Sequence, residues 1–561
     1  MIQTGNASFV ECNGRERAIR LLDNGTYKEL LGPFDGLESP HLEPQGIVPQ
    51  SDDGVIVVKG TMDGHRAVVI SIEGNFQGGG IGEVSGAKIA GTLEMVLKEC
   101  ESGKKTIPIL LFDTGGVRLQ EANYGLLSIA EIGAAIVALR RHVPVIAVIP
   151  GKIGAFGGMS ITAGLCSAII MTKEGRIGLN GPEVIEQEAG IREFDSKDRP
   201  LIWGTIGGEQ RTAAGFSDLL IEDDTGAVKT AILSIIKGDV IFETKTEQVQ
   251  RYEAFLNMAD PSRRISPEDV RDLWNQSGKK AFENCSASQN AKFKGRGQTW
   301  FDLLRNDAEE LGDIPSVRVA DAFIGEKKVR YIAVVPDAQN RFPRARNGEV
   351  GVLEGWSIAK HVRKAIEEDR NGKKRAIVAI VDVPSQAYGY HEELLGIHQA
   401  CAAAVDAYAS ARLAGHSVIS FIPGNAISGA FLSHGMQANR LIALRDPEVN
   451  VHVMSKQSAA RITQRSLEEL EAAAKKVPSM AYDIESFEQL GALHSLVDGV
   501  DASNPGQKDC NVIYKEIEKA IEDVAMSGST DLKNRLTSSF AKLGGRTASI
   551  LVREKLNEQW N

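Results

Sequence analysis

Two glycine-rich loops hold residues of this sequence that could do chemistry without charged side chains. GKIGAFGG at 151–158 and GNAISGA at 424–430 each follow an apolar run typical of a strand and precede a segment typical of a helix. A strand that turns into a helix at small residues directs free backbone N–H groups at one point. Such N–H groups can stabilise a negatively charged oxygen. For either loop alone, tight helix–sheet packing is the better interpretation.

A second loop accompanies each glycine loop. These companions are 114–121 (TGGVRLQE) and 384–389 (PSQAYG), and the matching pairs favour a functional role over packing alone. Tyr388 lies in the second companion loop, where its hydroxyl could donate a proton. His434 is a candidate substrate-binding residue, although a structural histidine is the better interpretation of it alone. The sequence shows no Ser-His-Asp order and no metal-ligand cluster, so no metal is expected.

The elements that must position these loops alternate between strands and helices. Apolar runs at 55–73, 106–113 and 143–150 predict strands, and helical spacing follows at 89–100 and 126–139, with a further helical segment at 159–169. This alternation indicates an α/β fold with helices outside a buried, largely parallel sheet.

The same order of elements returns later in the chain. RAIVAIVD at 375–382 and HSVISFIP at 416–423 predict strands, with an alanine-rich helix between them. Asp113 aligns with Asp382, and the pair Gly157-Gly158 aligns with Gly429-Ala430. One architectural unit is therefore used twice. The predicted domains are 1–240 and 306–561, joined by a connector at 241–305.

Composition limits the classes of function. The 561 residues carry a net charge of −10, which argues against nucleic acid as a partner. The six cysteines form no CxxC pair, as expected in a reducing compartment. No apolar run within these segments approaches the roughly 20 residues that cross a bilayer. We expect a cytoplasmic protein that does not bind membranes.

The loops resemble a known family. DTGGVRLQEANYG and AFGGMSITAGLCSAIIMTKEGRIGLNGPEVIEQEAGI resemble the beta subunit of biotin-independent malonate decarboxylase. VDVPSQAYGYHEELLGIHQACAAAVDAYASARLAGH and SGAFLSHGMQANRLIAL look like the gamma subunit of that complex. The chain thus resembles a beta–gamma fusion. More distantly, it is similar to the carboxyltransferase subunits of biotin-dependent enzymes, which implies two crotonase-like domains with an oxyanion hole in each.

The resemblance implies roles for individual residues. Val117, Gly157 and Gly158 would donate N–H groups at the first hole, and Gly429 and Ala430 at the second. Gln386 falls where the carboxyltransferases have a proline-glycine-aromatic loop, so the sequence departs from the family pattern at this catalytic candidate. The further candidates are Gly115, Gly116 and Ser428 for substrate binding and Arg344 and Arg346 for the phosphates of a carrier.

The family's reaction is decarboxylation of a malonyl thioester on an acyl carrier protein. The expected partners are this carrier and the acetyl-ACP:malonate ACP-transferase (alpha) subunit, and a homo-oligomer is left open. No cofactor is expected to be bound covalently by this chain, because the carrier brings a phosphoribosyl-dephospho-CoA arm. Two alternatives remain: a carboxyltransferase-type subunit of a biotin-dependent enzyme, and a non-catalytic scaffold that docks the carrier.

Overall fold

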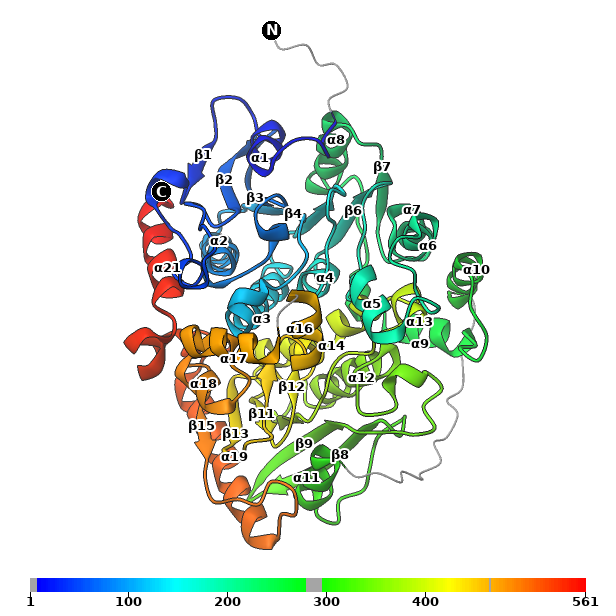
Figure 1. Ribbon diagram of the computed structural model, residues 1–561, viewed down its shortest axis with the longest axis vertical. Helices are drawn as coiled ribbons and strands as arrows, with labels where there is room; N and C mark the ends of the chain where they lie inside the picture. The colour runs from blue at the N-terminus through cyan, green and yellow to red at the C-terminus, as the bar shows by residue number, and fades with distance from the viewer. Residues whose placement is uncertain (1–7, 279–294, 464–465) are drawn as a thin grey trace. The chain divides into compact units, whose positions relative to one another are not determined.

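A computed structural model describes residues 8–278, 295–463 and 466–561 (Figure 1). The chain divides into two compact units that are not contiguous in sequence. The first unit comprises Met1–Gln248, Ile265–Gln276 and Thr547–Asn561, and the second comprises Val249–Arg264 and Ser277–Arg546. The structure thus divides the chain differently from the expected domains, because each unit contains a segment from elsewhere in the sequence.

The first unit is built on a seven-stranded sheet whose strands are hydrogen-bonded in sequence order. The strands are β1 (Lys28–Leu30), β2 (Val55–Met62), β3 (His65–Ile72), β4 (Ile107–Leu111), β5 (Ile146–Ile149), β6 (Ala168–Thr172) and β7 (Leu219–Ile221). The pairs from β3 to β7 are parallel, and β1–β2–β3 are antiparallel. Every residue of β4, β5 and β6 is buried, as continuous apolar runs predict for central parallel strands.

Helices precede, connect and follow the strands of this sheet. They are α1 (Gly14–Leu21), α2 (Glu83–Glu101), α3 (Ala122–Leu139), α4 (Gly158–Gly164), α5 (Pro182–Ala189), α6 (Arg199–Ile206), α7 (Gly208–Ala213) and α8 (Thr225–Ile236). The helix expected over 159–169 is shorter than predicted. It ends at Gly164, and Ala168 already begins β6, where the β-branched pair Ile169-Ile170 fits a buried strand.

The second unit repeats this topology. Its six-stranded sheet has the order β15-β13-β11-β10-β9-β8. The strands are β8 (Val317–Ile324), β9 (Lys327–Val334), β10 (Ala376–Ile380), β11 (Val418–Ile422), β13 (Arg440–Leu444) and β15 (Ser495–Val497). The hairpin β8–β9 is antiparallel and all later pairs are parallel, as in β2 to β7. The predicted internal repeat is confirmed.

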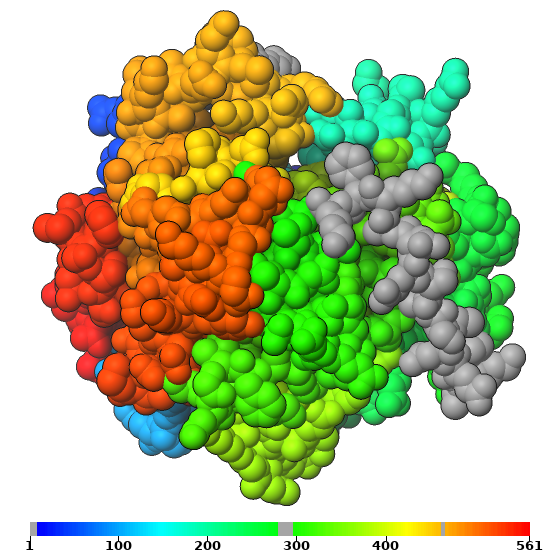
Figure 2. Space-filling model, turned by 90° about the horizontal axis from the view of Figure 1, so that it is seen from below, coloured from blue at the N-terminus to red at the C-terminus, as the bar shows by residue number. Residues whose placement is uncertain are grey.

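The second unit also has helices between its strands, and it has further helices before the first strand and after the last. They are α9 (Val249–Met258), α11 (Arg296–Arg305), α12 (Val352–Glu368), α13 (Tyr390–Leu394), α14 (Ile397–Leu413), α15 (Ser428–Ser433), α16 (Lys456–Thr463), α17 (Leu467–Lys476), α18 (Ile484–Gln489), α19 (Gln507–Ser527) and α20 (Asn534–Thr537). Helix α19 lies beside the β8–β9 hairpin, where orange and green surfaces meet in Figure 2. Lys327 there bridges Glu518 at 3.0 Å and Glu522 at 2.7 Å.

The segment expected to be a connector is largely helical where the structure describes it. Helix α9 belongs to the second unit, and all but the last residue of α10 (Pro267–Ser277) belongs to the first. Residues 279–294 of the expected connector lie outside the described residues. The connector is therefore part of both units and not a plain linker.

The C-terminal helix α21 (Thr547–Gln559) completes the first unit. Ser549 donates its backbone N–H to Glu83 at 3.0 Å, at the start of α2. Arg553 bridges Glu94 at 2.8 Å and Glu131 at 2.9 Å, which join α2 to α3. The helical stretch Leu119–Leu139 is long and apolar enough to cross a membrane, but 89% of its most apolar window is buried in the protein, as in a core helix.

Candidate active site

A short parallel ladder beyond the strand ends positions the loops of the first unit. Ala155 bridges Thr114 on one side and Ile177 on the other. Thr114 donates to the carbonyl of Gly154 at 2.8 Å, and Phe156 donates to the carbonyl of Thr114 at 3.1 Å. The loops after β4 and β5 are thereby held side by side, as the companion-loop hypothesis requires.

Two backbone N–H groups stand at the junction of these loops, one on Val117 and one on Gly158, the first residue of α4. Among the residues that the structure describes, neither N–H has an acceptor within the protein. The next two N–H groups of α4, on Met159 and Ser160, are already used, donating to Phe156 and Gly157. We call the N–H groups of Val117 and Gly158 the first donor site.

Glycine is favoured where the two loops meet. Gly116 has φ +107°, and a Cβ on it would lie 3.0 Å from the carbonyl oxygen of Phe156. Gly157 has φ +55° and ψ −144°, and a Cβ there would lie 3.9 Å from the Val117 nitrogen. The Gly157 N–H itself donates to Leu179 at 3.1 Å. The expectation that Gly157 is a donor is therefore wrong: it shapes the turn and leaves donation to its neighbour.

The residues on either side of Val117 hold the loop at 114–121 in place, and the sequence did not predict all of their contacts. Gly115 is exposed and donates to the carbonyl of Gly78 at 2.9 Å. Arg118 pairs with Asp53 at 2.6 Å and with Glu121 at 2.7 Å, and all three side chains are buried. Burial, opposed by Arg118 and reinforced by Glu121, raises the pKa of Asp53. Arg118, which makes both ion pairs of this cluster, is the residue that follows Val117.

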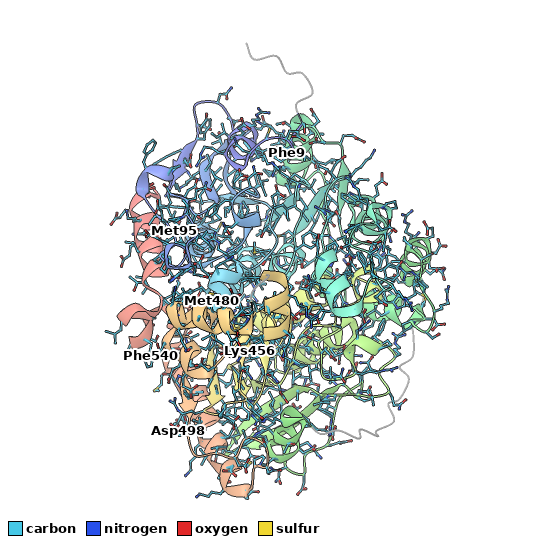
Figure 3. The ribbon with its side chains drawn as sticks, in the orientation of Figure 1. Phe9, Met95, Lys456, Met480, Asp498 and Phe540 are labelled. Carbon is cyan, nitrogen blue, oxygen red and sulfur yellow. The ribbon has the colours of Figure 1, made fainter. Side chains whose placement is uncertain are left out.

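The two loops of the first unit are also joined by a buried carboxylate. Asp113 Oδ1 accepts the N–H groups of Ile153 at 2.5 Å and Gly154 at 3.3 Å. Its Oδ2 pairs with Arg17 at 2.9 Å. The guanidinium of Arg17 also donates to the carbonyl of Phe9, which is labelled in Figure 3. The sequence identified Asp113 as an anchor of the repeat, but its partner Arg17 comes from a distant helix.

The second unit carries the same ladder in the same register. Ala426 bridges Val383 and pairs with Val451, as Ala155 bridges Thr114 and Ile177. Asp382 accepts the N–H of Asn425 at 3.1 Å. Counting from these bridges, Val117 corresponds to Gln386, Gly157 to Ser428 and Gly158 to Gly429.

The predicted alignment of the two loops is therefore wrong by one residue. Gly158 corresponds to Gly429, and not to Ala430, because the glycine loop of the second unit is shorter before the ladder. Ala430 corresponds to Met159 and lies one position beyond the donor. Ser428 takes the place of Gly157 and has a similar φ of +60°.

At the position equivalent to Gly158, the second site makes a contact that the first site lacks. The Gly429 N–H donates to the side-chain oxygen of Gln386 at 3.1 Å. Gln386 is 5% exposed. The N–H that corresponds to a donor of the first donor site is thus already occupied.

The remaining candidates of the second unit lie at different depths. His434 is fully buried, with Nδ1 3.0 Å from the Tyr408 hydroxyl and Nε2 3.0 Å from the Ile380 carbonyl. Burial lowers the pKa of His434 to about 4, so the ring is neutral. The substrate-binding expectation for His434 is wrong, because both of its nitrogens are engaged in the core.

The other three candidates surround the loop at 384–389. Tyr388 is half-buried within it. The Cγ of Arg344 would lie 3.2 Å from a Cβ placed on Gly389, so this side chain covers the end of the loop. Arg346 is exposed and donates from Nε to the Asn340 carbonyl at 2.9 Å. The roles of Tyr388, Arg344 and Arg346 remain predictions.

Comparison with known proteins places the chain in a family. Residues 345–560 match the family model of the malonate decarboxylase gamma subunit. The malonyl-S-ACP:biotin-protein carboxyltransferase MADC of Malonomonas rubra is 38% identical over 284 residues, which cover 48% of this chain and 89% of that protein. The corresponding MADD protein of the same organism is 37% identical over 250 residues, which cover 44% and 81%.

A solved structure is also similar. The crystal structure of a Pseudomonas malonate decarboxylase hetero-tetramer in complex with malonate includes a chain with 53% identity, covering 48% of this chain and 98% of that one, with a TM-score of 0.47. The expected fold class, α/β with two carboxyltransferase-type, crotonase-like units, is confirmed. The chain belongs to the malonate decarboxylase family and unites its beta-type and gamma-type halves in one polypeptide.

Proposed function

We propose that this chain is a carboxy-lyase that converts malonyl-S-acyl carrier protein into acetyl-S-acyl carrier protein and CO2. The observation that carries the proposal is the first donor site, where the N–H groups of Val117 and Gly158 lack an acceptor among the described residues. Backbone donors at a loop junction that no protein group satisfies are paired with water or with a ligand. The site therefore suits a ligand oxygen that becomes negatively charged.

The chemistry follows from the donors. When the bond between the carboxylate and the α-carbon breaks, CO2 leaves and the electron pair moves onto the thioester oxygen as an enolate. Val117 and Gly158 donate to that oxygen, and each such donor is worth about 3 to 4 kcal/mol in the transition state. A proton then adds to the α-carbon and gives the acetyl thioester. Charge balances without a redox partner.

The substrate arm and the partners complete the proposal. The thioester would arrive on the phosphoribosyl-dephospho-CoA arm of a carrier protein, in the cytoplasm, after an alpha subunit has exchanged acetyl for malonyl. Arg344 and Arg346 would meet the phosphates or the acidic carrier, because a half-buried Arg344 and an exposed Arg346 lie in the same loop region.

A second candidate function has a specific observation behind it. MADC and MADD are named as carboxyltransferases that act on malonyl-S-ACP and a biotin protein. If this chain did the same, the carboxyl group would pass to a biotin nitrogen before any CO2 appeared. A non-catalytic scaffold would release no CO2 under any condition.

One assay separates these functions. Purified chain is incubated with malonyl-carrier in deuterated water, with and without avidin, and the thioester is analysed by mass spectrometry. We expect avidin-insensitive release of CO2 and deuterium in the acetyl methyl group. Free malonate should not react, since it has no thioester oxygen for the donors. Turnover only after a biotinylated protein is added would establish the carboxyltransferase function instead.

Carrier docking has its own test. The double charge reversal Arg344→Glu/Arg346→Glu should raise KM for malonyl-carrier more than KM for malonyl-pantetheine, and added salt should reduce the difference. The control Arg370→Glu/Lys373→Glu changes the same net charge at exposed positions of the same unit. Equal effects of the two double variants would show that Arg344 and Arg346 do not guide the carrier.

A further inference from the structure

The second unit contains a counterpart of the first donor site, in which the N–H group equivalent to that of Gly158 is occupied. In both units a bridge holds the companion loop: Ile81 donates to Gly116 at 2.9 Å, and Val350 donates to Ser385 at 3.1 Å. The backbone N–H of the next residue after the donor position completes each bridge. Arg118 donates to the carbonyl of Ile81 at 2.9 Å, and Ala387 donates to the carbonyl of Val350 at 3.0 Å. The backbone around Val117 and Gln386 is therefore fixed in the same way.

These backbone bonds make the side chain of Gln386 unnecessary for holding the loop. In the first unit the same bonds suffice with valine at the equivalent position, and valine has no polar atom. Gln386 nevertheless places its amide oxygen 3.1 Å from the Gly429 nitrogen, on the N–H that corresponds to the Gly158 donor. An amide carbonyl is the same kind of acceptor as the carbonyl of a thioester or a urea.

We propose that Gln386 is a built-in carbonyl ligand that closes the donor site of the second unit. Of the two equivalent N–H groups, that of Gly158 then remains available to an external carbonyl compound, and that of Gly429 does not. Gln386 acts as a specificity-determining residue, because a reaction that needs a second carbonyl-binding site, such as carboxyl transfer to a urea nitrogen, finds that site occupied. This selection rests on the proposed function, whereas the closed site itself does not.

Burial supports a closed site over a mobile side chain. Gln386 is 5% exposed, and Gly429 and Ala430 are buried. An amide oxygen at this depth would lose its hydrogen bond if it turned away, and a buried unpaired polar group is costly. A competing ligand must therefore replace the hydrogen bond and fill the space of the side chain.

The amide of Gly429 reports directly on the closed site. Protein labelled with [15N]glycine is compared as wild type, Gln386→Met and Gln386→Ala, with the Gly429 signal assigned through Gly429→Ala. Methionine has the length of glutamine but no carbonyl. We expect the Gly429 amide to exchange with solvent about tenfold faster in both variants, since each loses the acceptor. Unchanged exchange in both would overturn the proposal.

Chemical rescue identifies the class of ligand. In Gln386→Ala, acetamide can enter the vacated space and offer the missing carbonyl, so it should restore the protection of the Gly429 amide. Propanol, which has no carbonyl, should not. Restoration by neither compound, or by both equally, would show that the site does not select a carbonyl.

The reciprocal exchange tests the same idea in the first unit. Val117→Gln should close the first donor site, so its turnover of malonyl-pantetheine should be about tenfold lower than that of Val117→Met, which has the same length. The Gly158 amide should become protected in Val117→Gln only. If the wild type has no decarboxylase activity, the proposed function fails, but the amide measurements on Gly158 and Gly429 still decide whether glutamine closes the site. Equal protection of Gly158 in both variants would contradict the proposal.

Discussion

The two units of this chain have the same topology but their equivalent sites are in opposite states. In the first unit, Val117 and Gly158 present N–H groups without an acceptor among the described residues. In the second, Gln386 occupies the N–H of Gly429. The strand order, the ladder and the anchoring carboxylate are shared. The comparison teaches that a repeated backbone preserves a donor site, while one side chain decides whether it is available.

The largest difference should follow from deleting the equivalent donors. Gly158→Pro removes one N–H at the first helical residue, a position where proline is tolerated. We expect kcat for malonyl-thioester decarboxylation to fall by about 10²–10³. Gly429→Pro deletes the corresponding N–H, which only Gln386 uses, and its effect should be far smaller. Steady-state kinetics with circular dichroism as a folding control measures both, and equal losses would remove the functional difference between the units.

The anchoring carboxylates should differ in stability. Asp113→Ala leaves the buried Arg17 without its charge partner, which costs about 3 to 5 kcal/mol. Asp382→Ala loses the bonds from Asn425 and Gly297 but strands no buried cation, so about 1 to 3 kcal/mol is expected. Thermal unfolding should rank the variants in this order. A lower Tm for Asp382→Ala than for Asp113→Ala would contradict this expectation.

His434 is a buried titratable residue at the end of α15 in the second unit. The equivalent residue at α4 in the first unit is Ala163, which does not titrate. The pKa of His434 is lowered to about 4 by burial. The unfolded chain binds the proton near pH 6.5, so stability should fall as the pH drops from 6.5 to 4, by up to about 3 kcal/mol.

The variant His434→Ala tests this acid sensitivity. It should lower Tm at pH 7, since the Tyr408 hydroxyl loses its acceptor, yet reduce the further loss of Tm between pH 7 and pH 5. His452, whose pKa burial lowers to about 3, remains in the variant and keeps part of the acid dependence. An identical pH profile in wild type and variant would show that His434 contributes nothing to it.

The smallest difference concerns the residue before each donor. Gly157→Ser introduces a side chain at φ +55° and ψ −144°, which should cost about 1 to 3 kcal/mol. Ser428→Gly should change stability by less than about 1 kcal/mol, because relief at φ +60° is offset by the freedom of glycine in the unfolded chain. Calorimetry on both variants compares the two turns, and a larger cost at Ser428 would contradict this account.

Much of the fold could be predicted from local patterns. The strands β4, β5 and β10 are continuous apolar runs, and β11 is interrupted only by the buried Ser420, because central parallel strands are buried on both faces. The outer strands β7 and β15 could not be placed, since they are short and partly exposed and lack such a run. The pattern over 159–169 predicts too long a helix, because its apolar composition continues into β6.

The sequence by itself determined the repeat, the loops that carry the donors and the family. Only the tertiary structure decided which donors are available, since an N–H is free or occupied according to acceptors far away in sequence. Leu179 takes the N–H of Gly157, and Gln386 takes that of Gly429. The register between the units was decided by the ladder, which shifts the alignment by one residue. The assignment of α9 to the second unit, and of α10 and α21 to the first, also depends on long-range packing, which no local pattern of residues reveals.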